Sequence, residues 1–318
     1  MEQFSFDTAF KHWQKTSGPK GYIWKHLLAF VVIMSVIYAG IYVWMFSAFS
    51  DILNMGSGAQ SGSLTQAEVS ELDSDVFYSM LKAYAVFIPA IPVLGILYAM
   101  FETAGLRRYI RNEGFSFKLG ADEWRTLAVY VLWVLTVIAV QFVLVLFGFV
   151  VTFVPAMTSG GEPPTIVFAL LPLLMFASMF FLLFVLVRLS PASALTFRDR
   201  KITFFSARRV SKGRFWPMFG AYALLYLMGY LALIGVQMVS MFIIMPGFFA
   251  AMPAIEVGSS DAMSQIFTNP LTLAGFGLMM VGMMTVMGFL QFAYLGVSSR
   301  AALTDPNWTN PQTASVFD

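Results

Sequence analysis

Six long apolar stretches dominate the chain, and its basic residues fall almost entirely on alternate connections between them. All but one of the 19 Lys and Arg residues lie in the first segment, in the second and fourth connections, and in the last segment. About 20 apolar residues in a helix cross the hydrocarbon core of a bilayer, and short loops rich in Lys and Arg stay in the cytoplasm. The pattern therefore predicts six membrane spans with both termini cytoplasmic.

The predicted spans cover residues 23–48, 77–101, 125–154, 165–188, 217–245 and 271–298, in a single integral membrane domain of residues 1–318. On this topology the cytoplasmic side carries a net charge of +9 and the outer side −7, which together give the formal +2 of the chain. The exception is Lys82, near the outer end of the second span, whose long side chain can reach the interface.

Composition supports a helical membrane protein. The chain is 58% hydrophobic and 11% charged, far below the charge of about 25% that is usual for soluble domains. The apolar runs lack the alternation of apolar and polar residues that a membrane β-barrel requires. The first run begins near Ile23 after a polar segment, and no small-residue cleavage site follows it. We therefore expect a retained anchor rather than a signal peptide.

Each basic cytoplasmic segment also contains aromatic residues and then enters a span. The three segments begin near Phe4-Ser5-Phe6, Phe115-Ser116-Phe117 and Ile202-Thr203-Phe204. We interpret them as three units, each a short amphipathic cytoplasmic helix followed by a transmembrane hairpin. The common demands of interfacial helices explain the likeness equally well. In both cases the segments are expected to lie on the inner leaflet and to attract anionic headgroups. The expected headgroup contacts are Arg107, Arg108, Arg208, Arg209, Lys212, Arg214 and Trp216.

Few polar residues lie in or beside the spans. Gln141, Gln237 and Gln291 are expected to bond neighbouring helices, and a substrate path is the alternative. Glu102 and Arg188 fall at the same inner depth, so they could form an interfacial pair. Separate contacts with water and headgroups are the favoured interpretation. No charged residue is expected in mid-bilayer, which argues against coupling to an ion gradient.

No catalytic, cofactor or metal site is predicted. Cysteine is absent, which excludes disulfides and thiolate chemistry. His12 and His26 have no carboxylate at a ligand spacing. The adjacent acids Asp122 and Glu123 are interpreted as the negatively charged first turn of a helix rather than as an acid–base pair. Pro89, Pro92 and Pro172 are expected to produce static kinks, and the basic connections are not interpreted as nucleic-acid sites.

Two segments resemble known bacterial families. Arg198 to Gly220 reads RDRKITFFSARRVSKGRFWPMFG and resembles the stretch that leads into a span in YciC-like inner-membrane proteins. The membrane domain attached to some glycerophosphodiester phosphodiesterases has a similar stretch. Leu119 to Arg125, LGADEWR, resembles a segment of uncharacterised bacterial six-span proteins. The resemblance implies a fold of packed hairpins in a bacterial inner membrane and carries over no catalytic residue.

The sequence therefore favours a non-enzymatic inner-membrane protein that binds lipid or a partner in a membrane complex. The basic cytoplasmic segments, together with the absence of charge inside the bilayer, support this hypothesis. A homo-oligomer is one form that the partner could take. The alternative function is transport of a lipid or small molecule, based on the prolines within the spans and on the three glutamines.

Overall fold

The computed structural model describes residues 4–15, 19–59, 66–158, 165–256, 269–306 and 308. Within these ranges the chain is helical and contains no strand. Six helical segments are long and apolar enough to cross a membrane, as predicted. The chain divides into two compact units, which are described separately. Unit 1 comprises residues 1–20, 99–224 and 292–318, and unit 2 comprises residues 21–98 and 225–291.

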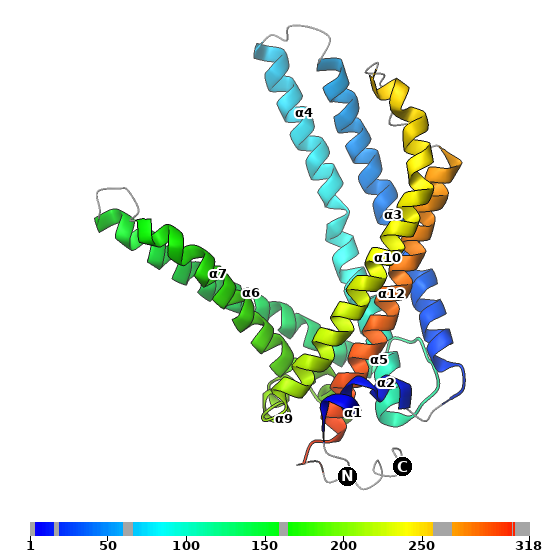
Figure 1. Cartoon of the computed structure of the whole chain (residues 1–318), viewed down its shortest axis with the longest axis vertical. Coiled ribbons are helices and arrows are strands. Elements are labelled where there is room, and N and C mark those ends of the chain that lie inside the picture. The colour runs from blue at the N-terminus through cyan, green and yellow to red at the C-terminus, as the bar shows by residue number, and fades with distance from the viewer. Residues whose placement is uncertain are drawn as a thin grey trace. The chain divides into compact units, whose positions relative to one another are not determined.

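Unit 2 contains most of four spans. Its helices are α3 (Tyr22–Ala59), α4 (Gln66–Ala85), the first half of α5 (Phe87–Arg111), and the longer parts of α10 (Phe215–Glu256) and α12 (Pro270–Leu303). Helices α3 and α4 run side by side (Figure 1). The Trp44 indole on α3 donates a hydrogen bond of 3.0 Å to the Lys82 carbonyl on α4. Helix α3, at 38 residues, is about 57 Å long, which exceeds the bilayer core.

The predicted second span is divided between two helices. Helix α4 ends at Ala85 and α5 begins at Phe87, with a turn at Val86. Pro89 explains the break, because proline has no N–H to donate to the carbonyl four residues earlier and its ring clashes there. Pro92 lies inside α5. In place of a simple kink within one helix, the structure has a break between two helices at Val86, in front of Pro89.

Helices α10 and α12 pack closely in unit 2 because glycines lie at their contacts. A side chain at Gly282 would place its Cβ 2.6 Å from the Val236 side chain. A Cβ at Gly229 would likewise overlap the Leu290 side chain. Small residues permit this approach of two membrane helices.

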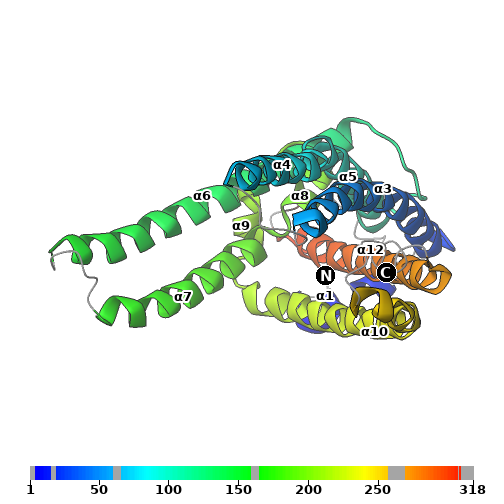
Figure 2. The same cartoon turned by 90° about the horizontal axis from the view of Figure 1, so that it is seen from above.

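Unit 1 contains a pair of spans and a core built from short segments that connect spans. Helices α6 (Ala121–Thr158) and α7 (Thr165–Leu189) form an antiparallel pair (Figure 2). After α7 come α8 (Ala192–Asp199), the short 3-10 helix η1 (Phe204–Ser206) and α9 (Ala207–Val210). Residues 192–197 of α8 are all buried. Helix α8 therefore belongs to the core of unit 1, and it precedes the segment from Ile202 that is predicted to lie on the leaflet.

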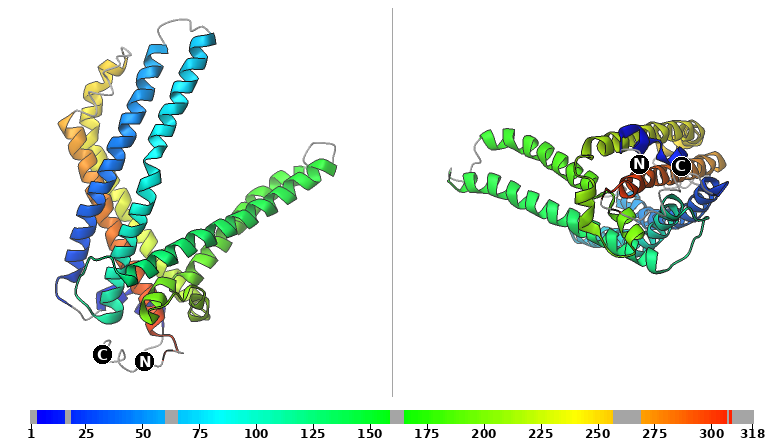
Figure 3. Two further views of the ribbon diagram at one scale, coloured as in Figure 1. Left: turned by 180° about the vertical axis from the view of Figure 1, so that it is seen from behind. Right: turned by 90° about the horizontal axis from the view of Figure 1, so that it is seen from below.

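The N-terminal helices α1 (Phe6–Phe10) and α2 (His12–Lys15) pack against the end of α12 (Figure 3). A Cβ at Gly296 would lie 3.2 Å from the Trp13 amide nitrogen. His12 stacks on Tyr109, with 5.5 Å between ring centroids. The Tyr109 hydroxyl in turn donates to the carbonyl of Phe292 at 3.0 Å.

The second predicted amphipathic helix does not form. Residues 112–119 have no helical structure. Asn112 ends α5 in the left-handed conformation, with φ of 53°, a common way for a helix to stop. The Phe117 ring then packs on Phe101, with 4.7 Å between ring centroids, so an aromatic contact within unit 1 takes the place of the expected interfacial helix.

Candidate cytoplasmic interface

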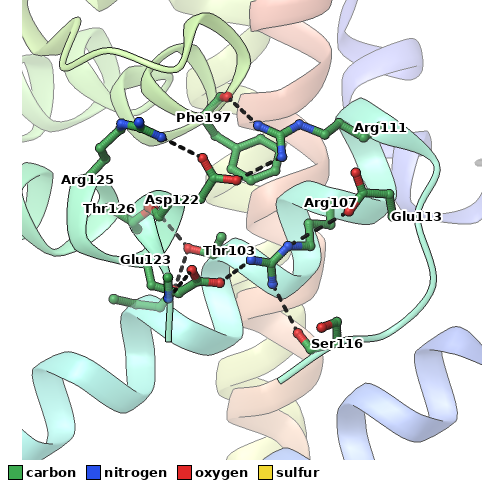
Figure 4. Close-up of polar contacts among 12 residues, drawn as sticks. Thr103, Arg107, Arg111, Glu113, Ser116, Asp122, Glu123, Arg125, Thr126 and Phe197 are labelled. Carbon is green, nitrogen blue, oxygen red and sulfur yellow. Dashed lines mark hydrogen bonds and ion pairs between the residues drawn. The ribbon is translucent and has the colours of Figure 1, made fainter. Parts of the chain in front are cut away.

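The second basic connection is held inside unit 1 by an ion network. We define the α5–α6 ion network as Arg107, Arg111, Asp122, Glu123 and Arg125, shown in Figure 4. Arg107 donates to Glu123, and the side chains of both residues are almost fully buried. The second Arg107 amino group donates to the Ser116 carbonyl at 3.1 Å. Charge-assisted bonds of this kind compensate for the loss of hydration.

Asp122 bridges two arginines at the start of α6. Arg111 donates to one carboxylate oxygen and Arg125 to the other, both at 2.8 Å. Arg111 also donates to the Phe197 carbonyl at 3.2 Å and lies 3.9 Å from the centroid of its ring. The network therefore joins α5, α6 and α8 (Figure 4).

Glu123 also caps the helix that carries it. Its second carboxylate oxygen accepts a hydrogen bond of 2.8 Å from the Gly120 amide, at the N-terminus of α6. A Glu in the first turn of a helix commonly reaches back in this way. The interpretation of Asp122 and Glu123 as an acidic first turn is confirmed. Their pairing with arginines of α5 was not predicted, because no spacing along the chain indicates it.

Two arginines of the fourth connection bind the end of α12. Arg214 donates to the Thr304 carbonyl at 2.6 Å and to its hydroxyl at 2.9 Å. Arg198 donates to the Ala302 carbonyl and lies 3.6 Å from the Asp305 carboxylate. These groups satisfy carbonyls that a helix C-terminus otherwise leaves without partners.

The seven residues predicted to contact headgroups fall into two groups. Arg107 and Arg108 are buried, at 1% and 8% exposure, and Arg214 is tied to Thr304. Arg208, Arg209, Lys212 and Trp216 are exposed. Only the second group is exposed in the structure.

The exposed group forms part of a continuous basic and aromatic segment. We define the α8–α10 basic segment as residues 200–216. Its cations Arg200, Lys201, Arg208, Arg209 and Lys212 are all exposed. Phe205 and Trp216 are each 75% exposed and Ile202 is 53% exposed. Large apolar side chains open to solvent beside cations are typical of a membrane interface.

Glu102 and Arg188 have different partners. The Tyr130 hydroxyl donates to Glu102, and the Arg188 guanidinium lies 5.5 Å from the centre of the Phe184 ring. Ser193 is also close enough to bond the Glu102 carboxylate. Tyr130 and Ser193 were missed by sequence reasoning, because they come from α6 and α8 and no spacing along the chain connects them to Glu102.

The three glutamines do not share a single environment. Gln141 and Gln237 are exposed on their helices. The amide nitrogen of Gln291 donates to the Tyr98 carbonyl at 3.5 Å. Its buried amide oxygen has no hydrogen-bond partner among the residues that the structure describes. Within unit 2, Val236 contacts Gly282, so the neighbouring Gln237 lies about 13 Å along the α10–α12 pair from Gln291.

Comparisons with protein-family models, curated proteins and solved structures found no match. The resemblance of Arg198–Gly220 and Leu119–Arg125 to bacterial inner-membrane families therefore stays a prediction.

Proposed function

We propose that this chain is a non-enzymatic protein of a bacterial inner membrane that binds anionic phospholipid headgroups through the α8–α10 basic segment. The observation that carries the proposal is the contrast between the two basic connections. In the second, Arg107 and Arg111 have carboxylate partners within the protein. In the fourth, five cations are exposed within 13 residues, and one of them, Arg209, also lies 3.8 Å from the Asp305 carboxylate.

The chemistry of the segment suits a lipid surface. Each basic residue near an anionic leaflet contributes about 1 kcal/mol of attraction. Phe205 and Trp216 would add apolar contact at the depth of the headgroups, where aromatic rings of membrane proteins are enriched. Trp216 lies in the first turn of α10, so its ring marks the place where this span begins.

The cellular location rests on charge asymmetry and on the family resemblance. The excess of Lys and Arg on alternate connections supports a cytoplasmic position for the basic segment. The cytoplasmic leaflet of a bacterial inner membrane is rich in anionic lipid, so it would provide the proposed ligand. Binding to a membrane-complex partner through the same exposed segment is the competing form of this proposal.

Transport of a lipid or small molecule is less well supported. It would need polar groups that converge on a path between spans. Gln237 and Gln291 lie at different levels of the same helix pair, and Gln141 is exposed on α6. Their positions are more consistent with separate contacts than with one substrate site.

Native mass spectrometry can test lipid binding with the purified full-length protein. Phosphatidylglycerol and phosphatidylcholine with identical acyl chains would be supplied together, and the retained lipids would be compared. We expect a preference for phosphatidylglycerol in the wild type. The triple variant Arg208→Gln, Arg209→Gln, Lys212→Gln should reduce that preference roughly tenfold or more, since it removes three cations worth about 1 kcal/mol each.

A charge-matched control separates the segment from the net charge of the protein. Lys20, Lys25 and Lys118 are also exposed, and their change to Gln removes the same total charge. This control should keep most of the preference. An equal loss in both triple variants would show a general charge effect, and no loss in the first would rule out the segment as the lipid site.

A further inference from the structure

Gln141 is a polar side chain exposed in the middle of an apolar span. It lies on α6, about 24 Å along the helix from Arg125 at the inner end, and the described residues include no hydrogen-bond partner for its amide. The stretch of α7 at the same level, residues 179–187, is entirely apolar. An amide that meets only hydrocarbon loses the hydrogen bonds that water would give it. Gln141 is therefore expected to pair with a polar group that the described chain does not supply.

The side chains in line with Gln141 form one continuous face of α6, the helix that pairs with α7 in Figure 2. Their spacing alternates between four and three residues, as in the seam of a left-handed coiled coil. We define the Gln141 face as Val134, Ile138, Gln141, Val145, Gly148 and Thr152. Val134 and Ile138 are each 57% exposed and Val145 is 68% exposed, so the face is uncovered at these positions.

The side chains of this face suit close contact with another helix. They are β-branched or small apart from the amide, whereas large rings such as Phe142 and Phe147 lie on other sides of α6. A Cβ at Gly148 would meet nothing within 4 Å, so the backbone is open there to the approach of a second helix. A seam of β-branched residues that contains a single polar side chain is typical of helix pairs with a defined register.

The partner that best fits this face is a second copy of the chain. The charge asymmetry gives every copy the same orientation in a membrane, so the α6 helices of two copies can pair only in parallel. In a parallel pair with a two-fold axis, each residue of the seam meets the same residue of the other copy. The two Gln141 side chains would then face each other at one depth.

The amide of Gln141 is complementary to itself. A glutamine side chain has an acceptor oxygen and a donor NH₂ group, so two of them can exchange two hydrogen bonds. A different protein would have to present a polar group at this one depth of the hydrocarbon core. A second copy meets that condition through its own sequence, because the symmetry of the pair brings the same amide to the same level.

We propose that the protein forms a parallel homodimer through the Gln141 face, in which the two Gln141 amides hydrogen-bond to each other within the membrane. The interface belongs to α6 and includes no residue of the α8–α10 basic segment. The homodimer therefore goes beyond the lipid binding proposed above and does not depend on it.

Cysteine cross-linking tests the face position by position, because the chain contains no cysteine of its own. Full-length Val134→Cys or Val145→Cys would be expressed with two different epitope tags in one cell, and its membranes oxidised with copper phenanthroline. Both variants should give disulfide-linked dimers that carry both tags. The matched controls are Val143→Cys and Val150→Cys, at valines that are 62% and 48% exposed on the opposite side of α6. They should give several-fold less dimer.

The contribution of the amide is tested by Gln141→Leu, which leaves the face apolar and removes its hydrogen bonds. Purified copies labelled with fluorophores at Lys118→Cys, an exposed position, would report dimer dissociation in detergent by Förster transfer. Gln141→Leu should raise the dissociation constant of the dimer roughly tenfold. The control Gln237→Leu makes the same change at the exposed glutamine of α10 and should leave the dissociation constant unchanged.

Equal cross-linking at the four valine positions would overturn the proposed interface, and this comparison decides the matter even if Gln141→Leu fails to accumulate. A dissociation constant that Gln141→Leu leaves unchanged would overturn the pairing of the amides. A cross-linked product whose mass is not twice that of the chain would identify a different protein as the partner and overturn the homodimer. The triple variant Arg208→Gln, Arg209→Gln, Lys212→Gln should cross-link like the wild-type background, so failure of lipid binding is distinguishable from failure of dimerisation.

Discussion

At the scale of single residues, the buried ion pair between Arg107 and Glu123 should be costly to break by removing one partner. Glu123→Gln would leave the Arg107 charge buried without its partner. Such a loss typically costs about 3–5 kcal/mol. We expect a clearly lower thermal unfolding temperature for this variant in detergent, measured by intrinsic fluorescence.

An exposed ion pair provides the comparison. Lys11 and Asp7 lie 2.6 Å apart on the surface of α1, with about half of each side chain exposed. Exposed pairs contribute little, because water and salt screen them. Asp7→Asn should therefore change the unfolding temperature much less than Glu123→Gln. An equal effect of the two variants would contradict a structural role for the buried pair.

His12 should make stability depend on pH. Burial, and secondarily the charge of Arg300, lowers the pKa of His12 to about 3, compared with about 6.5 in the unfolded chain. The folded state therefore takes up the proton less readily than the unfolded state. The stabilising contribution is complete above pH 6.5 and is lost as the pH falls toward 3. At pH 5 the loss is about 2 kcal/mol.

Unfolding temperatures of the wild type and His12→Gln between pH 7.5 and 5 measure this contribution. The wild type should lose more stability than the variant as the pH falls. Parallel curves would show that His12 is protonated equally well in the folded and unfolded chains. The variant also removes the stacking on Tyr109, so the slope with pH, rather than the absolute stability, is the diagnostic quantity.

At the scale of elements, glycines should decide whether α10 and α12 can pack. Gly282→Leu would push a side chain into Val236 and should destabilise the pair by about 1–3 kcal/mol. Gly277→Leu on the same helix is the matched control, because a Cβ at Gly277 meets nothing within 4 Å. Thermal unfolding in detergent should separate the two variants, and equal stabilities would show that the contact is not tight.

The sequence predicted elements better than it predicted contacts. Long apolar runs specify spans because lipid leaves the backbone few alternatives to a helix. The end of α5 was harder to predict, since Asn112 stops the helix and Phe117 packs on Phe101. Aromatic content alone had favoured an interfacial helix. Burial of α8 could not be predicted either, because it depends on contacts with distant parts of the chain. One of them joins Phe197 of α8 to Arg111 of α5, which also pairs with Asp122 of α6.

The candidate site was predicted only in part. A count of basic residues identified the exposed cations Arg208, Arg209 and Lys212 but did not distinguish them from Arg107, because charge alone does not reveal a buried partner. The hydrogen bond from Tyr130 to Glu102 could not be predicted, since the two residues lie 28 positions apart on different helices. The one available indication was that tyrosines such as Tyr130 lie near the ends of apolar spans, where they could reach a carboxylate on a neighbouring helix.

At the scale of the whole molecule, the charge asymmetry makes a prediction about orientation. The chain contains no cysteine, so a single introduced cysteine is a unique label site. Lys201→Cys lies in the exposed basic segment, and Ser63→Cys lies in the acidic connection between α3 and α4, outside the described residues. The positive-inside rule places the first in the cytoplasm and the second outside.

A membrane-impermeant maleimide should therefore label Ser63→Cys in intact bacterial cells and label Lys201→Cys only after the inner membrane is permeabilised. The outer membrane must be opened in both samples so that access to the inner membrane is equal. Labelling of Lys201→Cys in intact cells would reverse the orientation. It would also mean that the basic segment does not meet the anionic inner leaflet, because the exposed cations would then lie on the outer side of the membrane.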